Sequence, residues 1–81
     1  MRMHYMTICF MNDTEVTHIR RNGRLEITFE QACDTGFKTL ICDESGSIIR
    51  NVGFNSDEIA FFLDFLSRNI RTMQEESLGL L

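Results

Sequence analysis

The chain has 81 residues, of which eight are Lys or Arg and twelve are Asp or Glu, giving a net charge of −4 and a pI near 5.0. This acidic balance disfavours general binding to nucleic-acid backbones, because such binding needs clustered basic side chains that release counterions. The hydrophobic fraction of 43% and charged fraction of 25% are typical of a globular protein and exclude a disordered one. We expect one domain over residues 1–81 with a thin core, since a chain of this length buries only about 60% of its unfolded surface.

The cysteine pattern and the hydropathy of the chain point to a cytoplasmic protein. Cys9, Cys33 and Cys42 are odd in number and form no C-x-x-C pair, so reduced thiols are expected rather than disulfides or a zinc site. Cys9 and Cys42 stand in strand-like runs and are predicted to be small core residues. No apolar run has the length of a membrane span, and the first residues lack a signal-peptide pattern. We expect no metal, no cofactor and no membrane association.

The first predicted element is a strand over Tyr5–Met11, which is rich in β-branched and aromatic residues. Asn12-Asp13 then predicts a turn, because both residue types favour turn conformations.

A β-hairpin over Val16–Phe29 has the clearest local signal, since Asn22-Gly23 between two alternating runs is typical of a type I′ turn. The two-residue loop fixes the strand register. It predicts these opposing pairs: Arg21 with Arg24, Arg20 with Leu25, Ile19 with Glu26, His18 with Ile27, Thr17 with Thr28, and Val16 with Phe29. The predicted core face is Val16, His18, Leu25, Ile27 and Phe29, and the predicted water-facing residues are Thr17, Glu26 and Thr28.

Two features of this hairpin have both a structural and a functional interpretation. His18 lies on the apolar face without an acid, cysteine or second histidine at ligand spacing, so a structural role is favoured over a catalytic base. Arg20, Arg21 and Arg24 surround the turn and form a basic tip. A solvated turn is the favoured interpretation, and a site for phosphate or carboxylate is the alternative.

Glu30–Gly36 predicts a polar connection to a second hairpin. That hairpin has strands at Phe37–Asp43 and Ser47–Gly53, joined by Glu44-Ser45-Gly46. The predicted opposing pairs are Asp43 with Ile48, Cys42 with Ile49, Ile41 with Arg50, and Leu40 with Asn51. Leu40, Cys42 and Ile49 are predicted to face inward, and Phe37, Ile41, Ile48 and Val52 to face outward. Because both faces carry apolar residues, a second layer is expected on the outer side, and the same sheet in a homodimer would supply it.

The stretch Phe54–Met73 predicts an amphipathic helix. Asn55 and Glu58 have the spacing of a capping box, and Phe54 with Ile59 that of a hydrophobic staple. Asp57 and Glu58 in the first turn suit the positive end of the helix dipole. The predicted core stripe is Ile59, Phe62, Leu63, Leu66, Ile70 and Met73.

A second side of this helix carries Phe61 and Phe65, one turn apart, and continues through Arg68 and Thr72. Either another part of the chain covers these aromatic residues, or they form an exposed patch that binds a partner. The pattern does not decide between the two.

Together these elements predict an α+β fold: an antiparallel β-meander of about five strands with one C-terminal amphipathic helix packed on one face. No phosphate loop, nucleophile elbow or metalloprotease motif is present, and no polar cluster suggests a catalytic cleft. We therefore expect a non-enzymatic protein with no small-molecule substrate.

Two functions remain open on the sequence. The first is a protein-interaction module that self-associates or docks on a larger protein through Phe61, Phe65 and the outer sheet face. The second is an acidic inhibitor, of the accessory kind found in phages and mobile elements, that mimics nucleic acid and blocks an enzyme acting on it. Its candidate acidic surface comprises Glu15, Glu26, Glu30, Asp34, Asp43 and Glu44. A contiguous negative stripe would favour mimicry, and acids interrupted by arginine would not.

Overall fold

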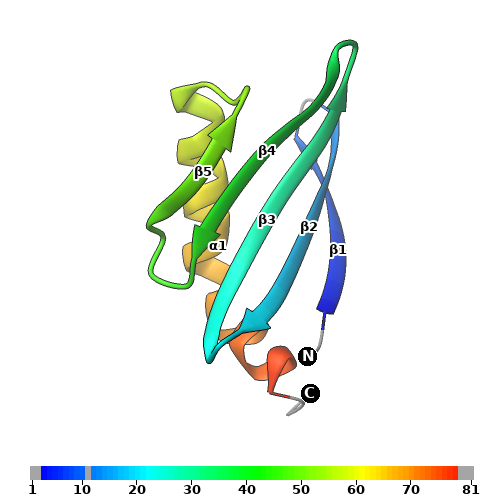
Figure 1. Ribbon diagram of the computed structural model, residues 1–81. Coiled ribbons are helices and arrows are strands. Elements are labelled where there is room, and N and C mark those ends of the chain that lie inside the picture. The colour runs from blue at the N-terminus through cyan, green and yellow to red at the C-terminus, as the bar shows by residue number, and fades with distance from the viewer. Residues whose placement is uncertain (1–2, 11, 79–81) are drawn as a thin grey trace.

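The computed structural model describes residues 3–10 and 12–78, with side chains from residue 14 onward except residues 76 and 77. In these residues an antiparallel sheet of order β1-β2-β3-β4-β5 is followed by one helix (Figure 1). The elements are β1 (Met3–Phe10), β2 (Asn12–Arg21), β3 (Arg24–Cys33), β4 (Gly36–Asp43), β5 (Ile48–Val52) and α1 (Ser56–Ser77). The predicted α+β meander with a C-terminal helix is confirmed.

The β2–β3 hairpin has the predicted register at all six opposing pairs, from Arg21 with Arg24 to Val16 with Phe29. Asn22 and Gly23 both have positive φ, 52° and 78°, as a type I′ turn requires. Asn tolerates the left-handed region better than other non-glycine residues, and Gly enters it without steric cost.

Two predicted connections were wrong because the strands continue through them. β3 runs to Cys33 and β4 begins at Gly36, so the chain turns at Asp34-Thr35 instead of through a polar loop over Glu30–Gly36. Gln31 interrupts the apolar pattern in sequence, yet it lies buried on the inner face and donates a hydrogen bond to Thr14 Oγ1 at 3.0 Å. Likewise, Asn12-Asp13, which the sequence predicts as a turn, is the start of β2. The first strand covers Met3–Phe10 where the sequence predicts Tyr5–Met11, and Met11 lies outside the described residues.

The β4–β5 hairpin departs from the predicted register after two correct pairs. Leu40 opposes Asn51 and Ile41 opposes Arg50 as predicted, but Cys42 opposes Ile48. A register shift between Ile41 and Cys42 leaves Ile49 as the extra residue of a bulge, a device common at sheet edges. The prediction that Ile49 faces inward is therefore wrong, and its side chain is 55% exposed.

The start of α1 is fixed by the predicted capping box. The Glu58 backbone N–H donates to Asn55 Oδ1 at 2.9 Å, and the Asn55 backbone N–H donates to Glu58 Oε1 at 3.0 Å. Lys38 Nζ on β4 lies 3.4 Å from Glu58 Oε2, which ties the helix N-terminus to the sheet. The cap of the helix is therefore also a contact between the two layers.

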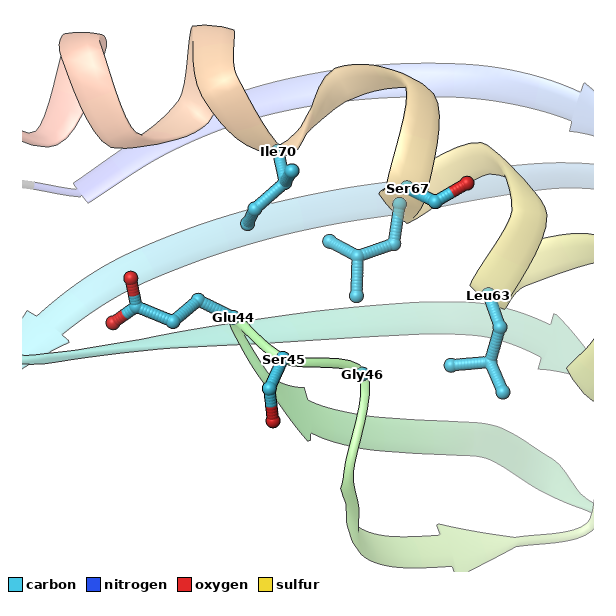
Figure 2. Close-up of a pocket in the computed structure, with 7 residues that line it drawn as sticks. Glu44, Ser45, Gly46, Leu63, Ser67 and Ile70 are labelled. Atoms are coloured by element: carbon cyan, nitrogen blue, oxygen red, sulfur yellow. The ribbon is translucent and has the colours of Figure 1, made fainter.

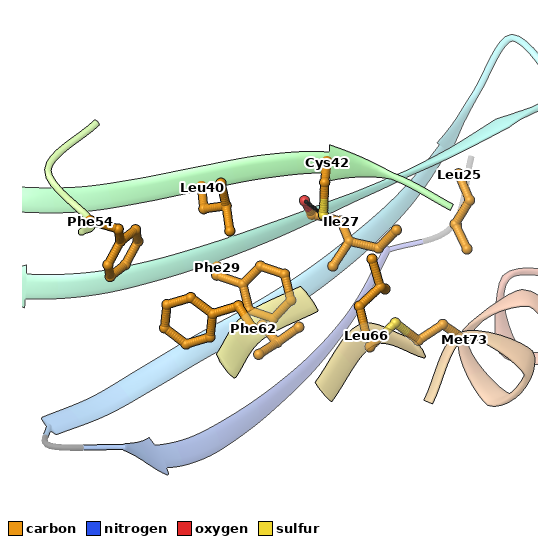
Figure 3. Close-up of a cluster of buried hydrophobic side chains, with 10 residues drawn as sticks. Leu25, Ile27, Phe29, Leu40, Cys42, Phe54, Phe62, Leu66 and Met73 are labelled. Atoms are coloured by element: carbon orange, nitrogen blue, oxygen red, sulfur yellow. Dashed lines mark hydrogen bonds between the residues drawn. The ribbon is translucent and has the colours of Figure 1, made fainter. Parts of the chain in front are cut away.

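The core lies between α1 and the inner face of the sheet (Figure 3). The Phe62 ring stacks on Phe29 with centroids 4.8 Å apart, and Phe54 contacts Phe62 edge to face at 4.9 Å. The other buried apolar residues are Val16, Leu25, Ile27, Leu40, Cys42, Leu66 and Met73. The predicted helix stripe is confirmed, with Ile59, Leu63 and Ile70 partly buried at its margins.

Candidate protein-interaction surface

The helix covers one face of the sheet and leaves the opposite face open, as Figure 1 shows with α1 behind the strands. Because side chains alternate along a strand, the residues between the buried core positions point to this open side. We call this surface the outer sheet face. It comprises the odd-numbered residues of β2 from Glu15 to Arg21 and of β4 from Phe37 to Asp43, the even-numbered residues of β3 from Arg24 to Ala32, and Arg50 and Val52 of β5.

Charge on the outer sheet face is divided between its two ends. At the β2–β3 turn, Arg21 lies directly opposite Arg24, and six pairs further along the same ladder Glu15 lies directly opposite Glu30. Like charges in directly opposing positions of an antiparallel pair are destabilising. The arginine pair is offset by nearby carboxylates, since Arg21 Nε lies 3.9 Å from Glu26 Oε1 and the charge of Arg24 helps to lower the pKa of Asp43. The Glu15–Glu30 pair therefore remains as the unfavourable one.

The apolar content of the outer sheet face is concentrated on β4 and β5. Phe37 is 63% exposed and Val52 43% exposed, while Ile41 between the ends is half-buried. Large exposed aromatic and branched side chains beside polar ones are a common feature of interaction surfaces. These residues give the face the apolar component that a charged surface alone would lack.

Two of the predicted acidic-surface residues have internal roles instead. Asp43 Oδ1 accepts hydrogen bonds from the Ser45 hydroxyl at 2.6 Å and from the Ser45 and Ser47 backbone N–H groups at 2.9 and 3.0 Å. These bonds, the Ser45 hydroxyl first, hold the pKa of Asp43 below its usual value. Glu44 accepts from the Leu25 backbone N–H at 3.2 Å and from Gln74 Nε2 at 2.7 Å, so it joins β3, the β4–β5 turn and α1.

The remaining predicted acids lie at or near the outer sheet face. Glu26 is half-buried, directly opposite Asp43, and 3.9 Å from Arg21 Nε. Asp34 is exposed in the turn between β3 and β4. The acidic residues are thus interrupted by arginine at the β2–β3 end and do not form one continuous stripe.

The structure separates the two predicted aromatic contacts on the helix. Phe65 is half-buried and meets Phe29 edge to face at 6.1 Å, so another element covers it, which was one of the two interpretations left open. Phe61 is 36% exposed and rests its ring against Phe62 at 5.8 Å. Arg68 is exposed and pairs with Asp64 at 3.1 Å, and Thr72 is exposed on the same helix. Phe61 and Phe65 therefore do not form a single exposed aromatic patch.

The predicted basic tip is divided as well. Arg20 lies on the opposite face of the hairpin from Arg21 and Arg24, and its Nη1 donates to the Gly23 carbonyl at 3.1 Å. A three-arginine anion site would need the guanidinium groups on one side. Only Arg21 and Arg24 share a side, and that side is the outer sheet face.

The buried titratable residues are placed for packing. His18 is 1% exposed on the inner face, opposite Ile27, as the structural interpretation predicted. Burial first, and the nearby Asp43 carboxylate second, raise the pKa of the Cys42 thiol to about 11. The predicted core role of Cys42 is confirmed, and that of Cys9 concerns a side chain outside the described ones. Cys33 is partly exposed, 3.6 Å from Thr35 Oγ1.

A groove of about 350 Å³ lies between α1 and the β4–β5 turn (Figure 2). Leu63, Leu66 and Ile70 form its apolar floor, and Glu44, Ser45, Gly46 and Ser67 line its remaining surface. It exists because the helix packs mainly over β1, β2 and β3 and leaves the inner side of the β4–β5 turn uncovered. No local pattern in the sequence predicts this groove, since it depends on where the helix crosses the sheet.

Comparisons of the chain with protein-family models, with curated proteins and with solved structures find no match. Among the described residues, no helix is both long and apolar enough to cross a membrane. No cluster of three or more His, Cys, Asp or Glu within that same part of the chain could hold a metal ion.

Proposed function

We propose that this protein is a non-enzymatic interaction module that binds a protein partner through its outer sheet face. The observation that carries the proposal is the uncovered side of the sheet, where Val52 is exposed in the row of Glu30 and Phe37 is exposed two residues further along β4, toward the β3–β4 turn. An antiparallel sheet that faces water normally shows polar residues on that side. Exposed Phe and Val on a rigid sheet instead supply the apolar contact area and fixed geometry that an interface needs.

The helix contributes less to this proposal than the sequence predicted. Phe65 is held against Phe29, which leaves Phe61, Arg68 and Thr72 as the exposed members of that set. Phe61 is 36% exposed and contacts Phe62, so only part of its side chain is available to a partner. We assign the primary contact to the sheet and treat the helix residues as a separate, smaller surface.

Nucleic-acid mimicry is the weaker alternative. It requires carboxylates spaced along one continuous surface so that they replace phosphates. Arg21 and Arg24 interrupt the acids at one end, and Asp43 and Glu44 are occupied by internal hydrogen bonds. This arrangement supports a general protein-interaction surface more than mimicry of nucleic acid.

Site-specific photo-cross-linking tests the proposed function. A photoreactive phenylalanine analogue at Phe37 should give a defined protein adduct in producing cells, whereas the same analogue at Ala60, exposed on the helix, should not. Val52→Asp should abolish the Phe37 adduct, because it places an unpaired charge at the centre of the apolar area. Equal labelling at both positions, or no adduct at either, would rule out the outer sheet face as a binding surface.

A further inference from the structure

We infer that the partner of the outer sheet face is a basic amphipathic helix of another protein, lying along β4 with its basic flank over β3. This inference rests on the proposed function and adds the chemistry and the placement of the partner. It starts from two neighbouring features of the face. One is the glutamate pair of Glu15 and Glu30, and the other is the exposed apolar area formed by Phe37 and Val52.

The glutamate pair has no counter-charge among the residues that the structure describes. Glu15 and Glu30 lie directly opposite each other on β2 and β3, and neither carboxylate makes a hydrogen bond or an ion pair with this part of the chain. Like charges in opposing positions repel each other. A Lys or Arg side chain of a partner, placed over the two carboxylates, would replace this repulsion with attraction.

The strand pairing places the glutamate pair beside the apolar area. One row across β2, β3, β4 and β5 is formed by Glu15, Glu30, Thr39 and Val52. Phe37 lies two residues from Thr39 along β4 and therefore on the same side of the sheet. Because neighbouring strands are only about 4.8 Å apart, an occupant that covers Phe37 and Val52 also reaches Glu30.

The backbone of the sheet decides the form of this occupant. The backbone groups of β3 and β4 are hydrogen-bonded to strands on both sides, so an extended peptide lying on the face could not pair with them. A segment that covers an apolar face must satisfy its own backbone N–H and C=O groups. An α-helix does so along its length. The sheet would then be the middle of three layers, with α1 on one side and the partner helix on the other.

The apolar area has the length of a short amphipathic helix. Phe37 and Ile41 both face outward on β4, four residues apart, which is about 14 Å along a strand. About nine helical residues cover this length and present apolar side chains at i, i+3 or i+4, and i+7. The small footprint predicts a weak complex in rapid exchange.

Charges on the two sides of β4 give the helix its orientation. Glu30 lies on the β3 side of β4, and the exposed Arg50 lies on the β5 side. Basic residues of the partner are therefore expected on the flank over β3, where they meet carboxylates, and not on the flank over β5. The net charge of −4 adds a long-range attraction for a basic partner.

A second copy of the chain is a poorer occupant. The arginine residues of its own outer sheet face, Arg21 and Arg24, already lie near the carboxylates of Glu26 and Asp43. Its own glutamate pair would bring further negative charge into the interface. An acidic helix is disfavoured for the same reason.

A titration with two designed peptides tests the inference on the purified full chain. Both probes are helical peptides of about 18 residues with the same leucine stripe, and they differ only in one flank, which is Lys in the first and Glu in the second. The Lys peptide should bind at least tenfold more tightly by isothermal titration calorimetry, and its affinity should fall as salt is added. Changes in NMR amide shifts should map to β3, β4 and β5 rather than to α1.

Variants of the chain identify which groups hold the peptide. Glu15→Gln/Glu30→Gln should weaken binding of the Lys peptide at least tenfold, and it removes a repulsive pair, so the fold should persist by circular dichroism. Asp64→Asn/Glu75→Gln is the matched control, since it changes the net charge by the same amount on α1 and should leave the affinity unchanged. Phe37→Ser should also weaken binding, because the leucine stripe loses its contact with a side chain that is 63% exposed.

Three results would overturn the inference: equal affinity for the two peptides, equal loss of binding in the glutamate variant and its control, or shift changes confined to α1. Cross-linking at Phe37 tests the proposed function separately. An adduct that maps to a segment with a Lys or Arg flank, and is lost in Glu15→Gln/Glu30→Gln, supports both. An adduct that maps to an acidic or neutral segment, or has twice the chain mass, keeps the outer sheet face as a binding surface and removes the basic helix as its occupant.

Discussion

The Phe62 ring of α1 stacks on the Phe29 ring of β3 at a centroid distance of 4.8 Å and an interplanar angle of 24°. This is the principal aromatic contact between the two layers, and both side chains are fully buried. Phe62→Ala should therefore lower the free energy of unfolding by about 3–5 kcal/mol, the usual cost of truncating a buried Phe. Urea denaturation followed by circular dichroism measures it.

The neighbouring Phe61 provides a matched control for this prediction. It has the same side chain on the same helix, but it is 36% exposed and meets Phe62 edge to face, with ring centroids 5.8 Å apart. Phe61→Ala should cost about 1 kcal/mol or less. Equal destabilisation by the two changes would contradict the assignment of Phe62, and not Phe61, to the core.

The capping box predicts a second pair of stability changes. Asn55→Ala removes the acceptor of the Glu58 backbone N–H and should cost about 1 kcal/mol, whereas Asn55→Gly should cost only a few tenths. Glu58→Ala should cost more, about 2 kcal/mol, because it also removes the partner of Lys38. Asp57→Ala, an exposed first-turn acid, is the control and should change stability by less than about 0.5 kcal/mol. A larger loss at Asp57 than at Glu58 would show that the dipole, not the cap, fixes this end.

The sequence predicted the fold because local signals carried most of it. The positive-φ turn at Asn22-Gly23 fixed six strand pairs, and the spacing of Asn55 and Glu58 fixed the helix start. The wrong prediction of a loop over Glu30–Gly36 arose because a tertiary contact overrides residue type. Gln31 is polar, but the hydrogen bond to Thr14 allows it to remain inside the sheet, so β3 extends into a stretch that its composition marks as a loop.

The candidate surface was only partly predictable. Extending the correct β2–β3 register by one pair places Glu15 opposite Glu30, so the charged ends could be derived from the sequence. The partial burial of Phe65 could not be derived from the sequence, because it depends on how α1 crosses Phe29. The hydrogen bond between Glu44 and Gln74 could not be derived either, because the two residues are thirty positions apart in the chain.

Burial predicts an unreactive thiol at Cys42. Its pKa is raised to about 11 and its side chain has no exposed surface, so the thiolate is scarce and inaccessible at neutral pH. In a Cys9→Ser background, Cys33 should react with a thiol reagent within minutes and Cys42 only after denaturation. Mass spectrometry of the labelled peptides distinguishes the two. Rapid labelling of Cys42 in the native protein would show that the space between β4 and α1 opens.

The Cys42 thiol also predicts that the free energy of unfolding falls at alkaline pH. Because the pKa of Cys42 in the folded chain lies above the unfolded value of 9.0, the unfolded state loses its proton first. Stability linked to this group is fully present below pH 9 and falls as the pH rises toward about 11. Cys42→Ala should reduce the steepness of this loss in urea denaturation between those values, and Cys33→Ala should leave it unchanged.

The hydrogen bonds to Asp43 predict a matching effect at low pH. Because the Ser45 hydroxyl is the strongest of the groups that lower its pKa, the folded value lies below the ordinary 3.8. The carboxylate therefore contributes stability above pH 3.8 that is lost as the pH falls through the folded pKa. Carboxyl NMR titration should show the pKa of Asp43 rising toward its ordinary value in Ser45→Ala. Ser47→Ala should change it much less, because Ser47 donates through its backbone N–H, which alanine retains. An equal shift of the pKa in the two variants would mean that the turn backbone, rather than the Ser45 hydroxyl, stabilises the Asp43 carboxylate.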